Sequence, residues 1–154
     1  EVFDGYGREL VKLCGRLMKA FSINLGLDEK ILQNGFGGED IGACLRVNFY
    51  PKCPRPELTL GLSSHSDPGG MTMLLPDDQV PGLQVRKCDN WITVKPAKHA
   101  FIVNIGDQIQ VNNLPLIHAV LLSLFGKCLA TINSSSYAQN CARGGDTCEV
   151  EVLV

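Results

Sequence analysis

The sequence predicts an α+β protein that is mainly β, with helices at its N-terminal end. Two observations lead to this prediction: a helical period over residues 2–25, and a series of short apolar segments separated by proline and glycine over residues 43–111. Short, regularly spaced strands with turn residues between them are typical of a β-sandwich or barrel, not of a parallel sheet with crossover helices. The chain has 154 residues, the size of one domain.

Residues 2–25 have the spacing of an amphipathic helix. The apolar side chains that recur on one side are Tyr6, Leu10, Leu13, Leu17 and Phe21. The basic side chains that fall elsewhere are Arg8, Lys12, Arg16 and Lys19. Asn24 and Gly26 end this helix, Asp28 is suited to cap a short second helix, and residues 34–38 end that one. A basic amphipathic helix either lies on a membrane or packs on a sheet, and we expect packing on a sheet.

Seven later segments are predicted to be strands because each is short, apolar and bounded by turn residues. They are residues 43–50, 60–66, 71–75, 83–86, 91–95, 100–105 and 107–111. The first has two distinct faces. One face is apolar and consists of Ala43, Leu45, Val47 and Phe49; the other consists of Cys44, Arg46, Asn48 and Tyr50. The polar face is either exposed to solvent, which the pattern alone favours, or the lining of a polar pocket.

An imidazole and a carboxylate stand two residues apart in His65-Ser66-Asp67, at the end of a predicted strand and before the turn Pro68-Gly69-Gly70. Alternate residues of a strand share one face, so His65 and Asp67 are expected to point the same way. Together they are two-thirds of the two-histidine, one-carboxylate triad that holds non-heme Fe(II). The motif alone is weak, since such residues also close turns.

Composition and charge exclude some classes of partner. Net charge is −2, which argues against a nucleic acid or an anionic membrane as the main partner, and no apolar run has transmembrane length.

The seven cysteines form no Cys-x-x-Cys pair and are odd in number, which predicts reduced thiols in a cytoplasmic protein. A chain that starts at Glu1 inside a predicted helix suggests a piece of a longer protein.

Several motifs resemble the plant 2-oxoglutarate- and Fe(II)-dependent dioxygenases, the family that includes jasmonate-induced oxygenases, anthocyanidin synthase and flavonol synthase. The resemblance covers residues 1–111 and is closest to the jasmonate-induced branch. Its motifs, in chain order, are residues 46–58 (RVNFYPKCPRPEL), His65-Ser66-Asp67, residues 81–85 (PGLQV), residues 91–94 (WITV) and Asn104-Ile105-Gly106-Asp107.

The resemblance implies a double-stranded β-helix, or jelly roll, with iron inside. It divides the chain into a helical segment (1–40), a partial jelly-roll domain (41–111) and a divergent tail (112–154). By position, His65 and Asp67 correspond to iron ligands, Asn48 and Tyr50 to residues that contact 2-oxoglutarate, and Arg46 to a partner for a substrate carboxylate. The implied cofactors are Fe(II), 2-oxoglutarate as cosubstrate, and O2. The implied reaction is oxidation of a small plant metabolite such as a jasmonate or a flavonoid.

The tail departs from the family pattern. The distal histidine ligand is expected near position 122, which is Leu122, and no Arg-x-Ser follows it to grip 2-oxoglutarate. His118 is either a substitute third ligand or an incidental histidine, and His99 is expected at the surface. We therefore expect the closing strands to be missing and sheet edges to be open, as after intron retention, altered splicing or a frameshift. Two functions follow: a fragment of a dioxygenase, inactive by itself, or a non-catalytic truncated product that acts as a binding protein.

Overall fold

The computed structural model describes residues 1–88, 90–111, 131–133, 137–140 and 147–154. The elements, in chain order, are α1 (Val2–Asn24), α2 (Ile31–Gly35), β1 (Cys44–Tyr50), β2 (Leu60–His65), β3 (Met71–Leu75), β4 (Leu83–Lys87), β5 (Asn90–Thr93), β6 (Ile102–Ile105), α3 (Asp107–Val111), β7 (Thr131–Asn133), β8 (Tyr137–Asn140) and β9 (Thr147–Leu153). Both N-terminal helices and the strands β1 to β6 are confirmed, with small shifts at their ends.

One predicted strand is wrong. Residues 107–111 form the short helix α3. Asp107-Gln108-Ile109-Gln110-Val111 alternates polar and apolar residues as a strand does, but five residues are also compatible with one helical turn. Contacts with distant parts of the chain decide between strand and helix. The backbone N–H of Gln108 donates to the Gly69 carbonyl, and Ile109 is buried in the core beneath α1.

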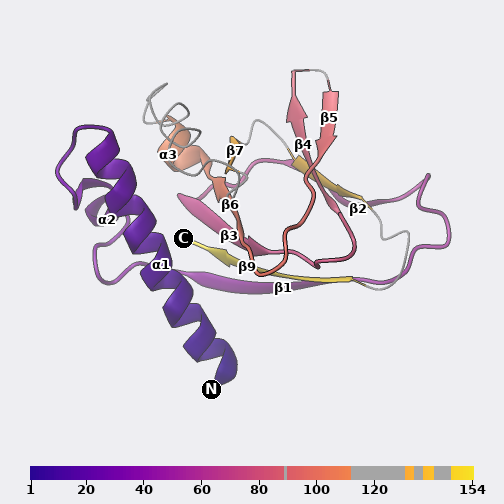
Figure 1. Ribbon diagram of the computed structural model, residues 1–154, viewed down its shortest axis with the longest axis horizontal. Helices are drawn as coiled ribbons and strands as arrows, with labels where there is room; N and C mark the ends of the chain where they lie inside the picture. Colours follow the sequence, from indigo (N-terminus) through magenta and orange to yellow (C-terminus); the bar gives the residue numbers. More distant parts are fainter. Residues whose placement is uncertain (89, 112–130, 134–136, 141–146) are drawn as a thin grey trace.

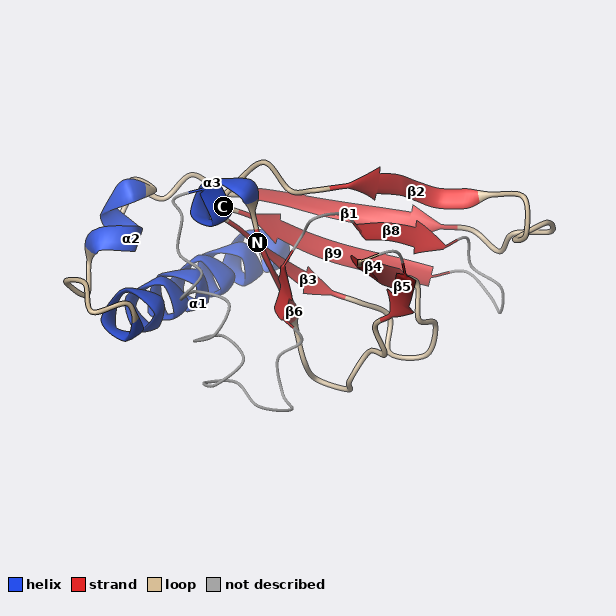
Figure 2. Cartoon of the chain, turned by 90° about the horizontal axis from the view of Figure 1, so that it is seen from above, coloured by secondary structure: helices blue, strands red, loops and turns tan. Residues whose placement is uncertain are grey.

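The described strands form two sheets, one in the order β1-β9-β3-β6-β7 and the other in the order β2-β8-β4-β5. Figures 1 and 2 show α1 at one end of the molecule and the strands extending away from it. The strand pairs are antiparallel, except for the parallel pair β6–β7. This arrangement confirms the predicted jelly-roll class with flanking helices.

The expectation that the tail leaves the sheets without closing strands is wrong for the described part of the tail. Strand β9 lies between β1 and β3 (Figure 1), and the pairings of β8 place it between β2 and β4. The sequence Glu149-Val150-Glu151-Val152 alternates acidic residues with valine, which is a strand pattern. Without β9, β1 and β3 would each have an unpaired edge, so pairing these backbones satisfies both.

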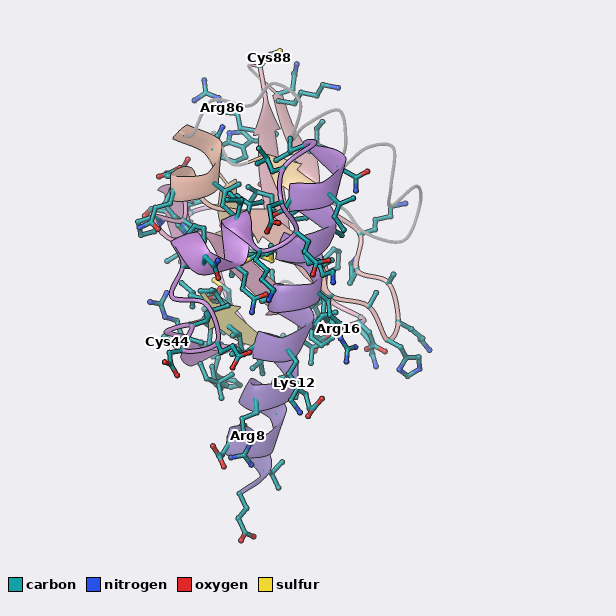
Figure 3. All side chains as sticks on the ribbon, turned by 90° about the vertical axis from the view of Figure 1, so that its left-hand side faces the viewer. Arg8, Lys12, Arg16, Cys44, Arg86 and Cys88 are labelled. Carbon is teal, nitrogen blue, oxygen red and sulfur yellow. The ribbon has the colours of Figure 1, made fainter. Side chains whose placement is uncertain are left out.

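Helix α1 packs against part of one face of the five-stranded sheet, which confirms sheet packing for this helix. Leu10, Leu17 and Phe21 are buried against residues that include Met73 and Val152. The basic side chains lie along the exposed side of the helix; Figure 3 labels Arg8, Lys12 and Arg16 there. Among the described residues, no helix combines the length and the apolar content needed to cross a membrane.

The register of β1 against β9 separates the two faces of this sheet. Leu45 is opposite Val152, and Arg46 is opposite Glu151. Residues paired across an antiparallel ladder share a face, so the α1-covered face carries Leu45 and Val152. The other face carries Arg46 and Glu151, and we call it the inner face; it also holds the β1 residues Asn48 and Tyr50.

Candidate metal site

The loop Asp67–Gly70 is held by the segment that follows β6. The amide of Asp107 donates to the Asp67 carbonyl at 2.8 Å, and the amide of Gly106 donates to the Gly70 carbonyl at 2.8 Å. A side-chain bond adds to these: Ser66 Oγ donates to Asp107 Oδ2 at 2.8 Å. Two motifs that are far apart in sequence, around residues 67 and 106, are therefore two sides of one contact.

This contact requires glycine at position 106. A Cβ atom placed on Gly106 would lie 2.1 Å from the Gly69 carbonyl oxygen and 3.1 Å from that of Asp67. Both obstacles are backbone atoms, which cannot rotate out of the way as a side chain can. Because Gly106 has no side chain, the two backbone segments approach closely. This close approach fixes the position of Asp67 at the start of the loop.

His65 and Asp67 lie side by side in the structure. His65 is the last residue of β2, and its Nε2 lies 3.9 Å from Asp67 Oδ1. The Asp67 side chain is 7% exposed and the His65 side chain 34%, so a buried carboxylate stands beside a ring that solvent can reach. The structure thus brings together the two residues that the spacing predicts on one face.

The tautomer of His65 suits it to bind a metal ion. Its Nδ1 lies 2.7 Å from the carbonyl oxygen of Ser63. A carbonyl oxygen only accepts, so Nδ1 carries the proton and donates. In the neutral ring Nε2 then carries the lone pair, on the side of Asp67. A backbone carbonyl that fixes the ring in this way is a common second contact of metal-binding histidines.

Asn104, in β6, orients the carboxylate of Asp67. Its Nδ2 donates to Asp67 Oδ2 at 3.5 Å, and the side chain is fully buried. Its Oδ1 has no hydrogen-bond partner among the described residues. A buried acceptor without a donor is costly, and here it lies on the side chain that holds Asp67. Asn104 belongs to the motif Asn104-Ile105-Gly106-Asp107, but its sequence position alone does not indicate this role.

Glu151, in β9, is an unexpected acidic residue on the inner face. Its side chain is 8% exposed, and its Oε2 lies 3.7 Å from Nη1 of Arg46, which is 56% exposed. The pKa of Glu151 is raised, mainly because the carboxylate is buried. The charge of Arg46 and a hydrogen bond with Asn48 act in the opposite direction and lower this pKa. The charge of Asp67 adds to the rise, and His65 lowers the pKa. The polar face of β1 is therefore the lining of a polar region, and Arg46 and Asn48 are both engaged there by Glu151.

The donor atoms of His65 and Asp67 fit an iron ion. An imidazole nitrogen and a carboxylate oxygen are donors that Fe(II) accepts. Within the described ranges, no group of three or more His, Cys, Asp or Glu side chains is placed to hold a metal. The predictions made for His118, Leu122 and the missing Arg-x-Ser motif lie outside the described residues. The guanidinium of Arg46, which the resemblance assigns to a substrate carboxylate, faces Glu151. His99 is exposed in a turn before β6, as predicted.

Comparison with known proteins gives consistent matches. Residues 41–123, more than half of the chain, match the profile of the 2OG-Fe(II) oxygenase superfamily. Jasmonate-induced oxygenase 2 of Arabidopsis thaliana is 77% identical over 111 residues, which are 72% of this chain and 30% of that protein. Flavonol synthase 1 of Crocosmia x crocosmiiflora is 42% identical over 106 residues, 69% of this chain and 32% of that protein. The chain thus spans about a third of the length of these relatives.

Two solved structures resemble the chain. The crystal structure of JOX2 in complex with 2OG, Fe and JA superposes with a TM-score of 0.82 and 57% identity, covering 99% of this chain and 41% of that one. The dioxygenase for auxin oxidation 1 of Arabidopsis thaliana, in its complex with 2-oxoglutarate, has a TM-score of 0.70 at 17% identity, covering 97% of this chain and 49% of that one. This second likeness concerns the fold alone.

Proposed function

This chain belongs to the 2OG-Fe(II) oxygenase superfamily, and from that premise we propose that it carries part of the iron site of a Fe(II)- and 2-oxoglutarate-dependent dioxygenase. The observation that carries the proposal is the pair His65 and Asp67, an imidazole whose Nε2 lies beside a buried carboxylate. When bound, iron with 2-oxoglutarate and O2 supplies the oxidising power of the family reaction.

The candidate site residues have separate tasks in this proposal. His65 and Asp67 hold the metal ion. Asn104 and the backbone around Gly106 keep Asp67 in place, which is the support that a ligand needs to stay oriented. In the same proposal Asn48 and Tyr50 face the cosubstrate, and Arg46 faces a carboxylate of the substrate.

A small plant metabolite such as a jasmonate or a flavonoid is the proposed substrate. The names of the relatives support this class: jasmonate-induced oxygenases and flavonol synthase.

The proposed location is the cytoplasm. It is supported by free thiols at Cys14, Cys44 and Cys88.

A non-catalytic role is the second candidate, and one observation favours it. Glu151 engages Arg46 and Asn48, two of the three residues proposed to meet the organic ligands. A chain in this state is expected to release no succinate by itself, while keeping its fold and its metal-binding pair.

An assay of succinate release tests the proposal. The chain is compared with a longer version that has the upstream region of the relatives, Leu122→His and a downstream Arg-x-Ser. We expect Fe(II)-dependent succinate release from the longer version only. No release by the folded longer version would contradict the dioxygenase proposal. Release by the unaltered chain that His118→Ala abolishes would show that the tail completes the site.

A further inference from the structure

Strand β1 is an outer strand of the five-stranded sheet. It pairs with β9 on one side, and on its other side no strand pairs with it among the residues that the structure describes. An outer strand presents a row of backbone N–H and C=O groups with which a further strand can pair. All seven residues of β1 pair with β9 without a register shift, so its outer side is regular over the same length.

The other described outer strands are less suited to pair with a further strand. β7 has three residues, and the pairing of β2 with β8 contains register shifts. β5 has four residues, the exposed Lys87 lies opposite its first residue, and the exposed Lys95 follows it. Short length, bulges and lysine residues are the features that keep sheet edges from associating. β1 has no bulge, no lysine and no proline.

The apolar face of β1 is only partly covered by α1. Leu45 packs against the core beneath the helix, whereas Val47 is 49% exposed and Phe49 is 61% exposed. The N-terminal end of α1 carries the exposed side chains Val2 and Phe3, and it extends past β1 on the side away from β9 (Figure 1). Apolar side chains exposed beside an unpaired strand indicate an association surface.

A groove lies between this end of α1 and the strands. It has a volume of about 590 Å³, and its lining includes Phe3, Val11, Leu45 and Val152. Apolar surface therefore lies on both sides of the point where α1 crosses the outer strand.

We propose that two copies of this chain form a dimer in which their β1 strands pair antiparallel about a twofold axis at Val47. The two five-stranded sheets then form one continuous sheet, and each strand fills the unpaired side of the other. This inference is independent of the proposed function, because it involves neither His65 nor Asp67.

The sequence of β1 is complementary to itself in this register. Leu45 lies opposite the partner's Phe49, and Arg46 lies opposite the partner's Asn48, so that apolar side chains face each other and no like charges do. An axis at Arg46 would place two guanidinium groups opposite each other. An axis at Asn48 would leave the first two residues of β1 unpaired.

The end of α1 supplies a second contact in this dimer. Phe3 lines the same groove as Leu45, and the helix continues past β1 at this position. Because Leu45 lies opposite the partner's Phe49, the projecting end of the helix lies over that side chain. The charges at the two ends of this contact are opposite in sign: Asp4 in the first turn of α1 and the partner's Lys52, two residues after β1. Each helix therefore covers apolar surface on the other copy.

Substitutions at exposed positions separate the interface from the fold. Val47→Lys places two positive charges at the axis, and a 1:1 mixture of Val47→Lys with Val47→Glu places opposite charges there. Phe49→Ser is a second test that adds no charge. Ile92→Lys is the matched control, since Ile92 is 46% exposed in the outer strand β5.

Sedimentation velocity between about 1 µM and 1 mM measures the dimer dissociation constant, with folding checked by circular dichroism. We expect dimers of the unaltered chain and of Ile92→Lys, a dissociation constant raised at least about tenfold in Val47→Lys and in Phe49→Ser, and recovery in the Val47→Lys and Val47→Glu mixture. A dimer that persists unchanged in folded Val47→Lys and Phe49→Ser would overturn the proposal.

A monomeric unaltered chain would overturn it as well. Hydrogen exchange of the β1 amides would then identify another occupant: protection only in the longer version that carries the upstream region of the relatives would assign this edge to that region. Neither result changes the expected succinate release, so the two proposals are tested separately.

Discussion

Ser66 and Asp107 are joined by a 2.8 Å hydrogen bond from Ser66 Oγ to Asp107 Oδ2, across 41 residues of sequence. The bond ties the residue between His65 and Asp67 to the first residue of α3. Together with the backbone bonds of Gly106 and Asp107, it fixes the loop that presents the Asp67 carboxylate. The placement of the candidate metal site therefore depends on a contact that no short stretch of the chain contains.

Removing this bond tests its contribution. Ser66→Ala is expected to lower the free energy of unfolding by about 1 kcal/mol, the usual net value of one hydrogen bond. Urea unfolding followed by circular dichroism measures it. Ser64→Ala, at an exposed position of β2, is the control and is expected to change little. Equal effects of the two substitutions would show that the Ser66–Asp107 bond adds no stability.

The close approach at Gly106 predicts a larger loss. Gly106→Ala forces backbone atoms apart, since its Cβ would lie 2.1 Å from the Gly69 carbonyl oxygen, and we expect destabilisation by at least about 2 kcal/mol together with weaker Mn²⁺ binding. Gly5→Ala is the matched control, because nothing lies within 4 Å of its Cβ position in α1. That variant is expected to gain about 0.5–1 kcal/mol from helix propensity. Gly106→Ala with unchanged stability would disprove the required backbone contact.

The charge of Glu151 predicts a pH dependence of stability. Burial raises the pKa of Glu151 in the folded chain. A carboxyl group whose pKa is raised by folding contributes its full stability to the folded chain when it is protonated, below its ordinary pKa. That contribution is lost as pH rises through the pKa of the folded state, because the buried group then ionises. Glu151→Gln is therefore expected to unfold at higher denaturant concentration than the unaltered chain at pH 7, with the difference vanishing below about pH 4. A less stable glutamine variant at pH 7 would mean that the ion pair with Arg46 outweighs the burial cost.

The thiol of Cys14 is expected to be unreactive. It is fully buried, and burial raises its pKa to about 11, so the thiolate is scarce at neutral pH. Cys44 and Cys88 are exposed (Figure 3). Alkylation with iodoacetamide at about pH 7.5, below the ordinary thiol pKa, should modify Cys44 and Cys88 first and Cys14 only after unfolding, as mapped by mass spectrometry. Equal rates at Cys14 and Cys88 would contradict the packing of α1.

Local patterns were enough to predict the helices and the strands β1 to β6. The helical period of α1 and the turn residues between strands are properties of short segments, and they survive in the structure because tertiary packing agrees with them. The segment 107–111 shows where this fails: five alternating residues do not distinguish a strand from one turn of helix, and the contact of Gln108 with Gly69 decides.

The tail was harder to predict, for a physical reason. Glu149-Val150-Glu151-Val152 has a strand pattern, but its place depends on β1 and β3, two strands that lie much earlier in the chain. Glu151 also lies outside every motif of the family resemblance. The pairing of Arg46 with Glu151 is therefore visible only once the register is known.

The measurement that tests the central claim most directly is Mn²⁺ binding by electron paramagnetic resonance to the unaltered chain, His65→Ala, Asp67→Ala and His99→Ala. His99→Ala is the control, because His99 is exposed in a turn. If His65 and Asp67 hold the metal, the chain and His99→Ala bind one Mn²⁺ with equal affinity, and each of the other two variants loses at least tenfold. Unchanged affinity in folded His65→Ala or Asp67→Ala would contradict the claim that this pair is the metal site.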